Sequence, residues 1–195
     1  MTRRRRAYRT DALIKREYRT LCSMVLLNTM ATAAYGVIVD LMTAQISEAY
    51  FNLDHPSLGM PKIFHSSNAA VLGISWGLVA SVPLGIGLGI WIALSAQYGS
   101  WPRIGRRMVG LAVMVILVLT GVSALGVGEW SYRQALAQGQ STAVAGEICA
   151  LRVHQVSYLM GVSAAVCLCV GILIHRKQLL RAADVSGGKH PASSG

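Results

Sequence analysis

Residues 35–56, YGVIVDLMTAQISEAYFNLDHP, carry an apolar run past Asp40 and into a polar loop. The run begins near residue 21, so it is long enough to cross the hydrocarbon core of a bilayer as a helix. Within it, Asn28, Thr32, Gly36 and Asp40 recur every four residues, which places them on one helical face. Because an unsatisfied polar group in hydrocarbon costs several kcal/mol, this face is expected to turn toward protein.

Three further apolar runs follow, so that the predicted spans are residues 21–42, 69–96, 108–128 and 153–174. Hydrophobic residues make up 53% of the chain and charged residues only 13%, with a mean hydropathy of +0.48. The charges cluster between the apolar runs, as the bilayer requires. We therefore predict an all-α membrane protein whose four-transmembrane-helix bundle occupies residues 21–175. A basic segment, 1–20, precedes it, and a tail, 176–195, is expected to be basic and then disordered.

Lys and Arg are distributed unevenly over the predicted connections. The N-terminal segment has eight, the second loop three and the tail four, whereas the first and third loops have one and two. The positive-inside rule then predicts an N-in/C-in protein of the bacterial inner (plasma) membrane, with both termini cytoplasmic. The basic N-terminus is expected to contact anionic lipid and no nucleic acid. A cleaved signal peptide is the alternative for the first span, but the long basic segment and Asn28 disfavour it.

Small residues form ridges on the second and fourth predicted spans. At four-residue steps these are Gly73, Gly77, Ser81, Gly85 and Gly89 on the second span, and Ser157 and Gly161 on the fourth. Such ridges let helix backbones approach closely inside a bilayer. They exceed the obvious needs of one small bundle, so a homo-oligomer or another membrane protein is a possible partner.

The predicted topology gathers several ionisable and aromatic residues at the outer face. They are Asp40, Glu48, Tyr50, Asp54, His55, His65 and His154. Carboxylates and imidazoles bind divalent metals or relay protons, but no His-x-x-x-His spacing fixes a ligand set. The metal is therefore unknown and no cofactor is predicted. Alternatively, Asp40 is bonded to a neighbouring hydroxyl and the loop charges are solvated. A short interfacial helix is expected near residues 46–51, with Tyr50 and Phe51 at headgroup level.

The motifs Y-G-x-x-x-D-x-x-T, from Tyr35 to Thr43, and Y-F-x-x-x-H-P, from Tyr50 to Pro56, resemble a pattern in bacterial four-span integral membrane proteins of no established activity. The resemblance implies the same architecture and an outer-face focus. This chain departs from it at Val39, where such proteins often have His, and at Ala49, where they have Glu. A site that used that His would be incomplete here.

Three classes of function remain open at this point. The leading hypothesis is a non-enzymatic accessory or assembly subunit. The alternative is a small transporter, or a metal- or proton-linked protein, that uses Asp40, His55 and His154. The third is an intramembrane serine hydrolase, because residues 73–77 match G-x-S-x-G around Ser75. That motif works on a strained strand-to-helix turn, whereas here it lies within a predicted span, so an enzyme is disfavoured.

Overall fold

The computed structural model describes residues 3–52 and 66–187 and is helical almost throughout. The helices are α1 (Arg3–Ile46), α2 (Glu48–Asn52), α3 (Ala69–Gln97), α4 (Arg106–Ala137) and α5 (Thr142–Gly187). Each of the four long helices contains a segment long and apolar enough to cross a bilayer. The described ranges contain no strand. The predicted all-α fold, a bundle of four long apolar helices, is confirmed.

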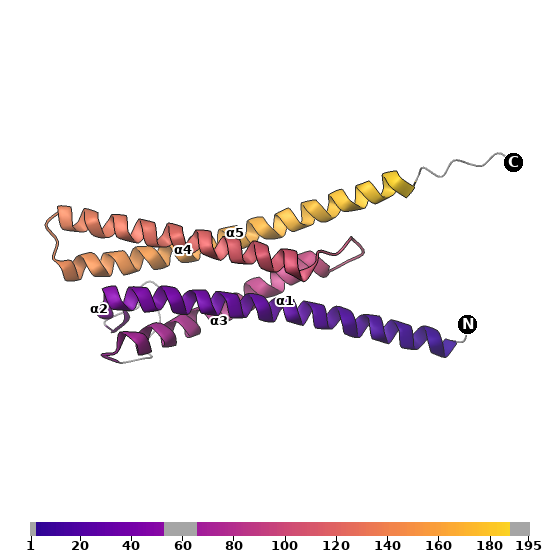
Figure 1. Ribbon diagram of the computed structural model, residues 1–195, viewed down its shortest axis with the longest axis horizontal. Helices are drawn as coiled ribbons and strands as arrows, with labels where there is room; N and C mark the ends of the chain where they lie inside the picture. The colour runs from indigo at the N-terminus through magenta and orange to yellow at the C-terminus, as the bar shows by residue number, and fades with distance from the viewer. Residues whose placement is uncertain (1–2, 53–65, 188–195) are drawn as a thin grey trace.

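The long helices form two hairpins, α1 with α3 and α4 with α5, and packing is denser within each hairpin than between them. α1 begins and α5 ends at the same end of the molecule, which we call the terminal end (Figure 1). α2 and the α4–α5 connection lie at the opposite end, the turn end (Figure 1). The two hairpins enclose the space in which the candidate site lies.

The small residues of α3 bring its backbone against that of α1. A Cβ added to Gly77 would lie 2.6 Å from Cα of Val37, and one added to Gly73 would lie 2.7 Å from Cα of Leu41. Only glycine fits such a contact, because the opposing atoms are backbone and cannot move aside. The amide of Asn28 also donates to the carbonyl of Gly85 at 2.8 Å. The ridge on α3 is therefore occupied by α1 of the same chain.

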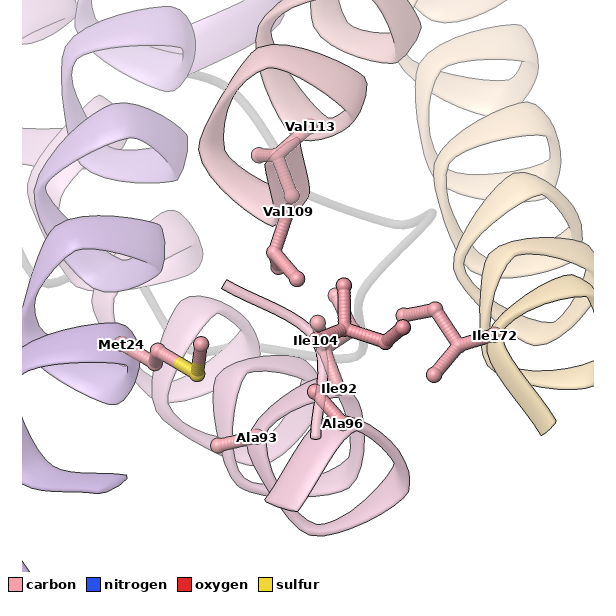
Figure 2. Close-up of a cluster of buried hydrophobic side chains, with 8 residues drawn as sticks. All are labelled: Met24, Ile92, Ala93, Ala96, Ile104, Val109, Val113 and Ile172. Carbon is pink, nitrogen blue, oxygen red and sulfur yellow. The ribbon is translucent and has the colours of Figure 1, made fainter. Parts of the chain in front are cut away.

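Apolar side chains from all four long helices close the terminal end of the space between the hairpins (Figure 2). The buried members of this apolar plug are Met24, Ile92, Ala93, Ala96, Ile104, Val109, Val113 and Ile172. Water is excluded from such a cluster, because transferring its apolar surface out of water is favourable. The plug therefore separates the interior of the bundle from the basic segments at the terminal end.

Arg176 lies beside this plug and is only 1% exposed. Its guanidinium donates to the carbonyls of Ser95, Tyr98, Trp101 and Pro102 at 2.6–3.2 Å. The last carbonyls of a helix have no helical partner and carry partial negative charge, so a cation stabilises them. The sequence analysis counted Arg176 among the basic residues of the tail and assigned it no contact. The residue instead attaches α5 to the α3–α4 connection.

The helices extend well beyond the predicted spans. α4 continues to Ala137 and α5 begins at Thr142, so only residues 138–141 separate them. Gly139 has a φ of +78°, a conformation that glycine adopts without strain, and allows this short reversal. α1 similarly starts at Arg3, and α5 continues to Gly187. The apolar runs predict only the part of each helix that lies in hydrocarbon. The helix itself can continue through polar residues until the backbone turns, so the helices are longer than the predicted spans.

A short helix was expected near residues 46–51, and α2 lies there, with its aromatic side chains packed inward against α3. Tyr50 is 7% exposed and Phe51 only 1% exposed, and both pack on Leu72 and Trp76 of α3. Ser47 fixes the start of α2, since its hydroxyl accepts from the Tyr50 amide at 3.2 Å. Because buried aromatic surface stabilises a fold, α2 faces inward and covers the turn end of the bundle.

Candidate functional site

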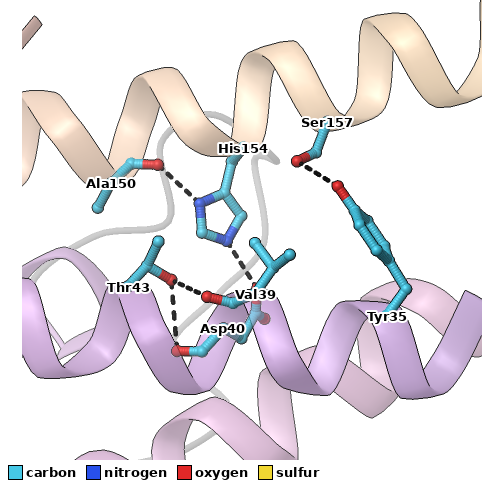
Figure 3. Close-up of polar contacts among 7 residues, drawn as sticks. All are labelled: Tyr35, Val39, Asp40, Thr43, Ala150, His154 and Ser157. Atoms are coloured by element: carbon cyan, nitrogen blue, oxygen red, sulfur yellow. Dashed lines mark hydrogen bonds and ion pairs between the residues drawn. The ribbon is translucent and has the colours of Figure 1, made fainter. Parts of the chain in front are cut away.

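A buried Asp–His pair between the two hairpins forms the centre of the site (Figure 3). Oδ1 of Asp40 on α1 lies 2.9 Å from Nε2 of His154 on α5. The other ring nitrogen, Nδ1, lies 2.7 Å from the carbonyl oxygen of Ala150, one turn earlier on α5. Asp40 is 5% and His154 4% exposed. Both belong to helix segments long and apolar enough to span a membrane.

The hydrogen bonds of His154 limit the protonation of the pair. The carbonyl of Ala150 can only accept, so Nδ1 of His154 carries a hydrogen. The hydrogen between Nε2 and Asp40 then belongs either to an imidazolium or to a carboxylic acid. In both cases the pair has no net charge. Adding or removing one proton leaves a single uncompensated charge in a buried site, which is costly.

Neighbouring side chains cover and orient the pair. The ring of Tyr50 lies 5.0 Å from that of His154, centroid to centroid, and the Phe51 ring lies 5.8 Å from it. On α1, the hydroxyl of Thr43 donates to the backbone carbonyls of Val39 and Asp40 at 2.9 and 3.3 Å (Figure 3). The pair is therefore covered by α2 at the turn end.

A second hydrogen bond links the same two helices deeper in the bundle. The hydroxyls of Tyr35 on α1 and Ser157 on α5 lie 2.9 Å apart (Figure 3). Ser157 is one turn beyond His154, and Tyr35 is just over one turn before Asp40, so the two contacts lie in succession along the α1–α5 interface. Both of these polar contacts join one hairpin to the other.

A cavity of about 70 Å³ begins at the pair and continues between the hairpins. Besides Asp40 and His154, its polar wall residues are Asn28, Thr32, Tyr35, Ser81, Thr120, Ser157 and Tyr158. Asn28 and Asp40 are twelve residues apart on α1, so the lined length is about 18 Å at 1.5 Å per residue. The cavity therefore follows the bundle axis through more than half of a typical hydrocarbon core.

The structure brings together three of the seven residues predicted for the outer-face site: Asp40, Tyr50 and His154. Glu48 is the first residue of α2 and is exposed. Asp54, His55 and His65 lie outside the described residues. Within the described part of the chain, no three His, Cys, Asp or Glu side chains come close enough to hold a metal ion.

The two predicted ridges have different surroundings. Gly73, Gly77, Ser81, Gly85 and Gly89 are all buried, and a Cβ at any of the four glycines would come within 3.2 Å of α1. In contrast, Ser157 bonds Tyr35, and a Cβ at Gly161 would meet nothing within 4 Å. Both residues line the cavity. The small residues on α5 therefore leave space for the cavity, whereas the glycines of the α3 ridge are in close contact with α1.

Some residues of the site were missed by the sequence analysis. Tyr35, Thr43 and Ser157 stand in the motifs or ridges quoted above, but nothing assigned them contacts. Thr120 was overlooked, although it is a polar residue within an otherwise apolar run, and it is 2% exposed. An isolated polar residue in an apolar run predicts a position that faces protein, because lipid-facing positions rarely hold one. Thr120 could have been identified in this way.

The G-x-S-x-G match lies entirely inside α3. Its glycines, Gly73 and Gly77, contact the backbone of α1, and Ser75 has helical neighbours on both sides. The strained turn that exposes a catalytic serine is therefore absent at these residues. The motif has a packing explanation instead.

Comparison with protein-family models, with curated proteins and with solved structures gave no match for this chain. The resemblance to bacterial four-span proteins therefore stays a prediction. Function has to be inferred from the site itself.

Proposed function

We propose that the protein is a small proton-linked membrane transporter whose proton-binding group is the Asp40–His154 pair. One observation carries this proposal: an Asp and a His, each at least 95% buried, meet between two hairpins of helices that are long and apolar enough to span a membrane. Ionisable residues at such positions are expensive and are characteristic of ion and proton pathways. The cavity that begins at the pair supplies the space for a solute.

The contacts between the hairpins support a specific coupling. Toward the turn end, the hairpins are linked by the hydrogen bonds Asp40–His154 and Tyr35–Ser157. At the terminal end, the apolar plug and the bonds of Arg176 hold the hairpins together. Because a proton gained or lost leaves an unpaired buried charge, it favours separation of the hairpins at the turn end, where water can reach the pair. Solute binding and proton binding then influence each other reciprocally.

The proposal is tested by proton uptake in proteoliposomes that contain the full-length protein and an internal pH-sensitive dye. Asp40→Asn keeps a hydrogen-bonding side chain opposite His154 but removes the group that exchanges a proton, so we expect uptake to fall to the level of empty vesicles. Glu48→Gln is the matched control, since it neutralises the exposed carboxylate of α2 and should leave uptake unchanged. Equal uptake by Asp40→Asn and the natural protein would overturn the proposal.

Cys149 provides a second readout of the coupling. It is 4% exposed and packs in a cluster with Val39 of α1 and Val153 of α5. Opening of the hairpins at the turn end should therefore increase its labelling by a membrane-permeant maleimide, followed by mass spectrometry. Maleimide reacts with the thiolate, so labelling rises with pH in any variant. We therefore expect the ratio of Cys149 labelling in the natural protein to that in Asp40→Asn, measured at the same pH, to change with pH.

The accessory-subunit hypothesis remains a proposal with reduced support. Its argument was that the small-residue ridges exceed the needs of one bundle. The α3 ridge is in contact with α1, and the α5 ridge lines the cavity, so neither is left for a partner. Co-purification of a second protein from gently solubilised membranes, lost on changes to the lipid-facing side of α4, would restore it.

A further inference from the structure

The cavity between the hairpins contains hydroxyl groups that no protein group satisfies. Thr32 of α1, Ser81 of α3 and Thr120 of α4 all line it and are 8%, 7% and 2% exposed. Within the described ranges, none of these three hydroxyls makes a hydrogen bond. Their oxygens are open to the cavity and not enclosed by protein atoms, so each can bond to a molecule that occupies it.

Other threonines of α1 behave differently. The hydroxyl of Thr29 donates to the carbonyl of Val25 at 2.9 Å, and that of Thr43 donates to the carbonyl of Val39 at the same distance. This bond to the preceding turn is the ordinary solution for threonine in a helix. Thr32 and Thr120 do not adopt it, although both lie inside helices with the same backbone geometry. Their hydroxyls are left available to the cavity.

The remainder of the wall limits the chemistry of an occupant. Leu84 and Leu88 of α3 and Ile116 and Leu117 of α4 supply apolar surface, and the missing side chain of Gly161 leaves space on α5. The ionisable wall residues Asp40 and His154 are bonded to each other, and together they carry no net charge. A charged occupant would be buried without a counter-charge, which is strongly unfavourable. The wall therefore suits an uncharged molecule with both polar and apolar atoms.

From these contacts we propose that the cavity binds a small uncharged solute of the short amide, urea or diol class, held by the hydroxyls of Thr32, Ser81 and Thr120. The size follows from the volume: an apolar cavity of about 150 Å³ accepts benzene, so about 70 Å³ admits a molecule of only a few heavy atoms. This inference names the solute class of the proposed transport function and in that respect rests on it.

Binding can be measured directly on the full-length protein in lipid nanodiscs, with ¹³C-labelled threonine methyl groups as NMR probes. The titrants are acetamide, urea and ethane-1,2-diol, and acetate is the charged counterpart of acetamide. We expect at least one neutral titrant to shift the Thr32 and Thr120 signals saturably, while the Thr29 signal is unchanged and acetate has no saturable effect. Absence of a saturable shift with all three neutral titrants would overturn the inference.

Two threonine variants make the test specific. Thr120→Val removes one cavity hydroxyl at nearly constant shape, so the Kd read from Thr32 should rise about two- to tenfold for the loss of one hydrogen bond. Thr29→Val removes a hydroxyl that bonds its own helix and should leave the Kd unchanged. An equal effect of the two substitutions would contradict binding by the cavity hydroxyls.

Asp40→Asn separates this inference from the proposed function. Because the solute is held by hydroxyls, the variant should still bind whichever neutral titrant binds the natural protein, even though it no longer takes up protons. Solute binding together with normal proton uptake in Asp40→Asn would overturn the proton-linked function and leave the binding site intact. Proton uptake that depends on Asp40, without any solute binding, would overturn the solute class alone.

Discussion

At the scale of single residues, the structure brings together Asp40 and His154, which the sequence analysis identified separately, in one site. Asp40 and His154 were both predicted at the outer face, because each lies near the end of a predicted span. Their contact at 2.9 Å could not be predicted, since it depends on how α1 and α5 are rotated against each other. The aromatic cover from Tyr50 and Phe51 was missed for the same reason: aromatic residues beside a span are equally compatible with the headgroup layer and with the protein interior.

Arg176 allows a test at this scale. Its guanidinium satisfies four backbone carbonyls that would otherwise lack partners, and hydrogen bonds to charged groups contribute more than neutral ones. We expect Arg176→Gln to lower the free energy of unfolding by about 2–4 kcal/mol, since glutamine can replace only part of this network. Unfolding in mixed detergent micelles measures the change.

The neighbouring Lys177 is the matched control for Arg176. It is exposed, so Lys177→Gln removes the same charge without disturbing a buried contact and should change the unfolding free energy by no more than about 0.5 kcal/mol. Equal effects of the two substitutions would mean that the positive charge, and not the bonds to the α3–α4 connection, matters for stability.

At the scale of elements, the apolar runs predicted the number and order of the long helices correctly. They failed to give the helix ends, because α4 and α5 continue through polar residues to a turn at Gly139. The ridge spacing identified the face of α3 that packs closely, but it could not identify which helix covers that face. Sequence periodicity shows which residues share one face of a helix. Which other helix packs against that face depends on the shapes of all the helices in the bundle.

The ridge gives a prediction with an internal control on the same helix. A Cβ at Gly77 would lie 2.6 Å from backbone atoms of α1, whereas a Cβ at Gly87 would meet nothing within 4 Å. Gly77→Leu should therefore force α1 and α3 apart and lower the free energy of unfolding by about 3 kcal/mol or more. Gly87→Leu places an apolar side chain at an exposed position and should be neutral or stabilising.

Unfolding of these two glycine variants in detergent distinguishes two explanations of the ridge. If Gly77→Leu unfolds like the natural protein but dissociates from a larger complex, the ridge serves a partner and the α1–α3 contact is not its main role. If it destabilises the isolated chain, as we expect, the ridge belongs to the bundle itself.

At the scale of the whole molecule, charge and geometry together predict the orientation in the membrane. α1 begins and α5 ends at the terminal end (Figure 1). Arg103 of the α3–α4 connection pairs with Glu17 of α1, and α4 begins with Arg106 and Arg107. We propose that this end is cytoplasmic, in a bacterial inner membrane, because Lys and Arg are retained on that side. The cavity then lies between a cytoplasmic plug and an outer cover formed by α2.

This orientation is tested by reporter fusions to the full chain in a bacterial host. A reporter that is active only in the cytoplasm should work when joined to either terminus, and a reporter active only outside the cytoplasm should work when inserted at Gly139. The turn at residues 138–141 tolerates an insertion because it is exposed and short of packing contacts. The reverse pattern would place Asp40 and His154 near the cytoplasm. Protons would then reach the pair from inside the cell, and the proposed direction of opening would have to be inverted.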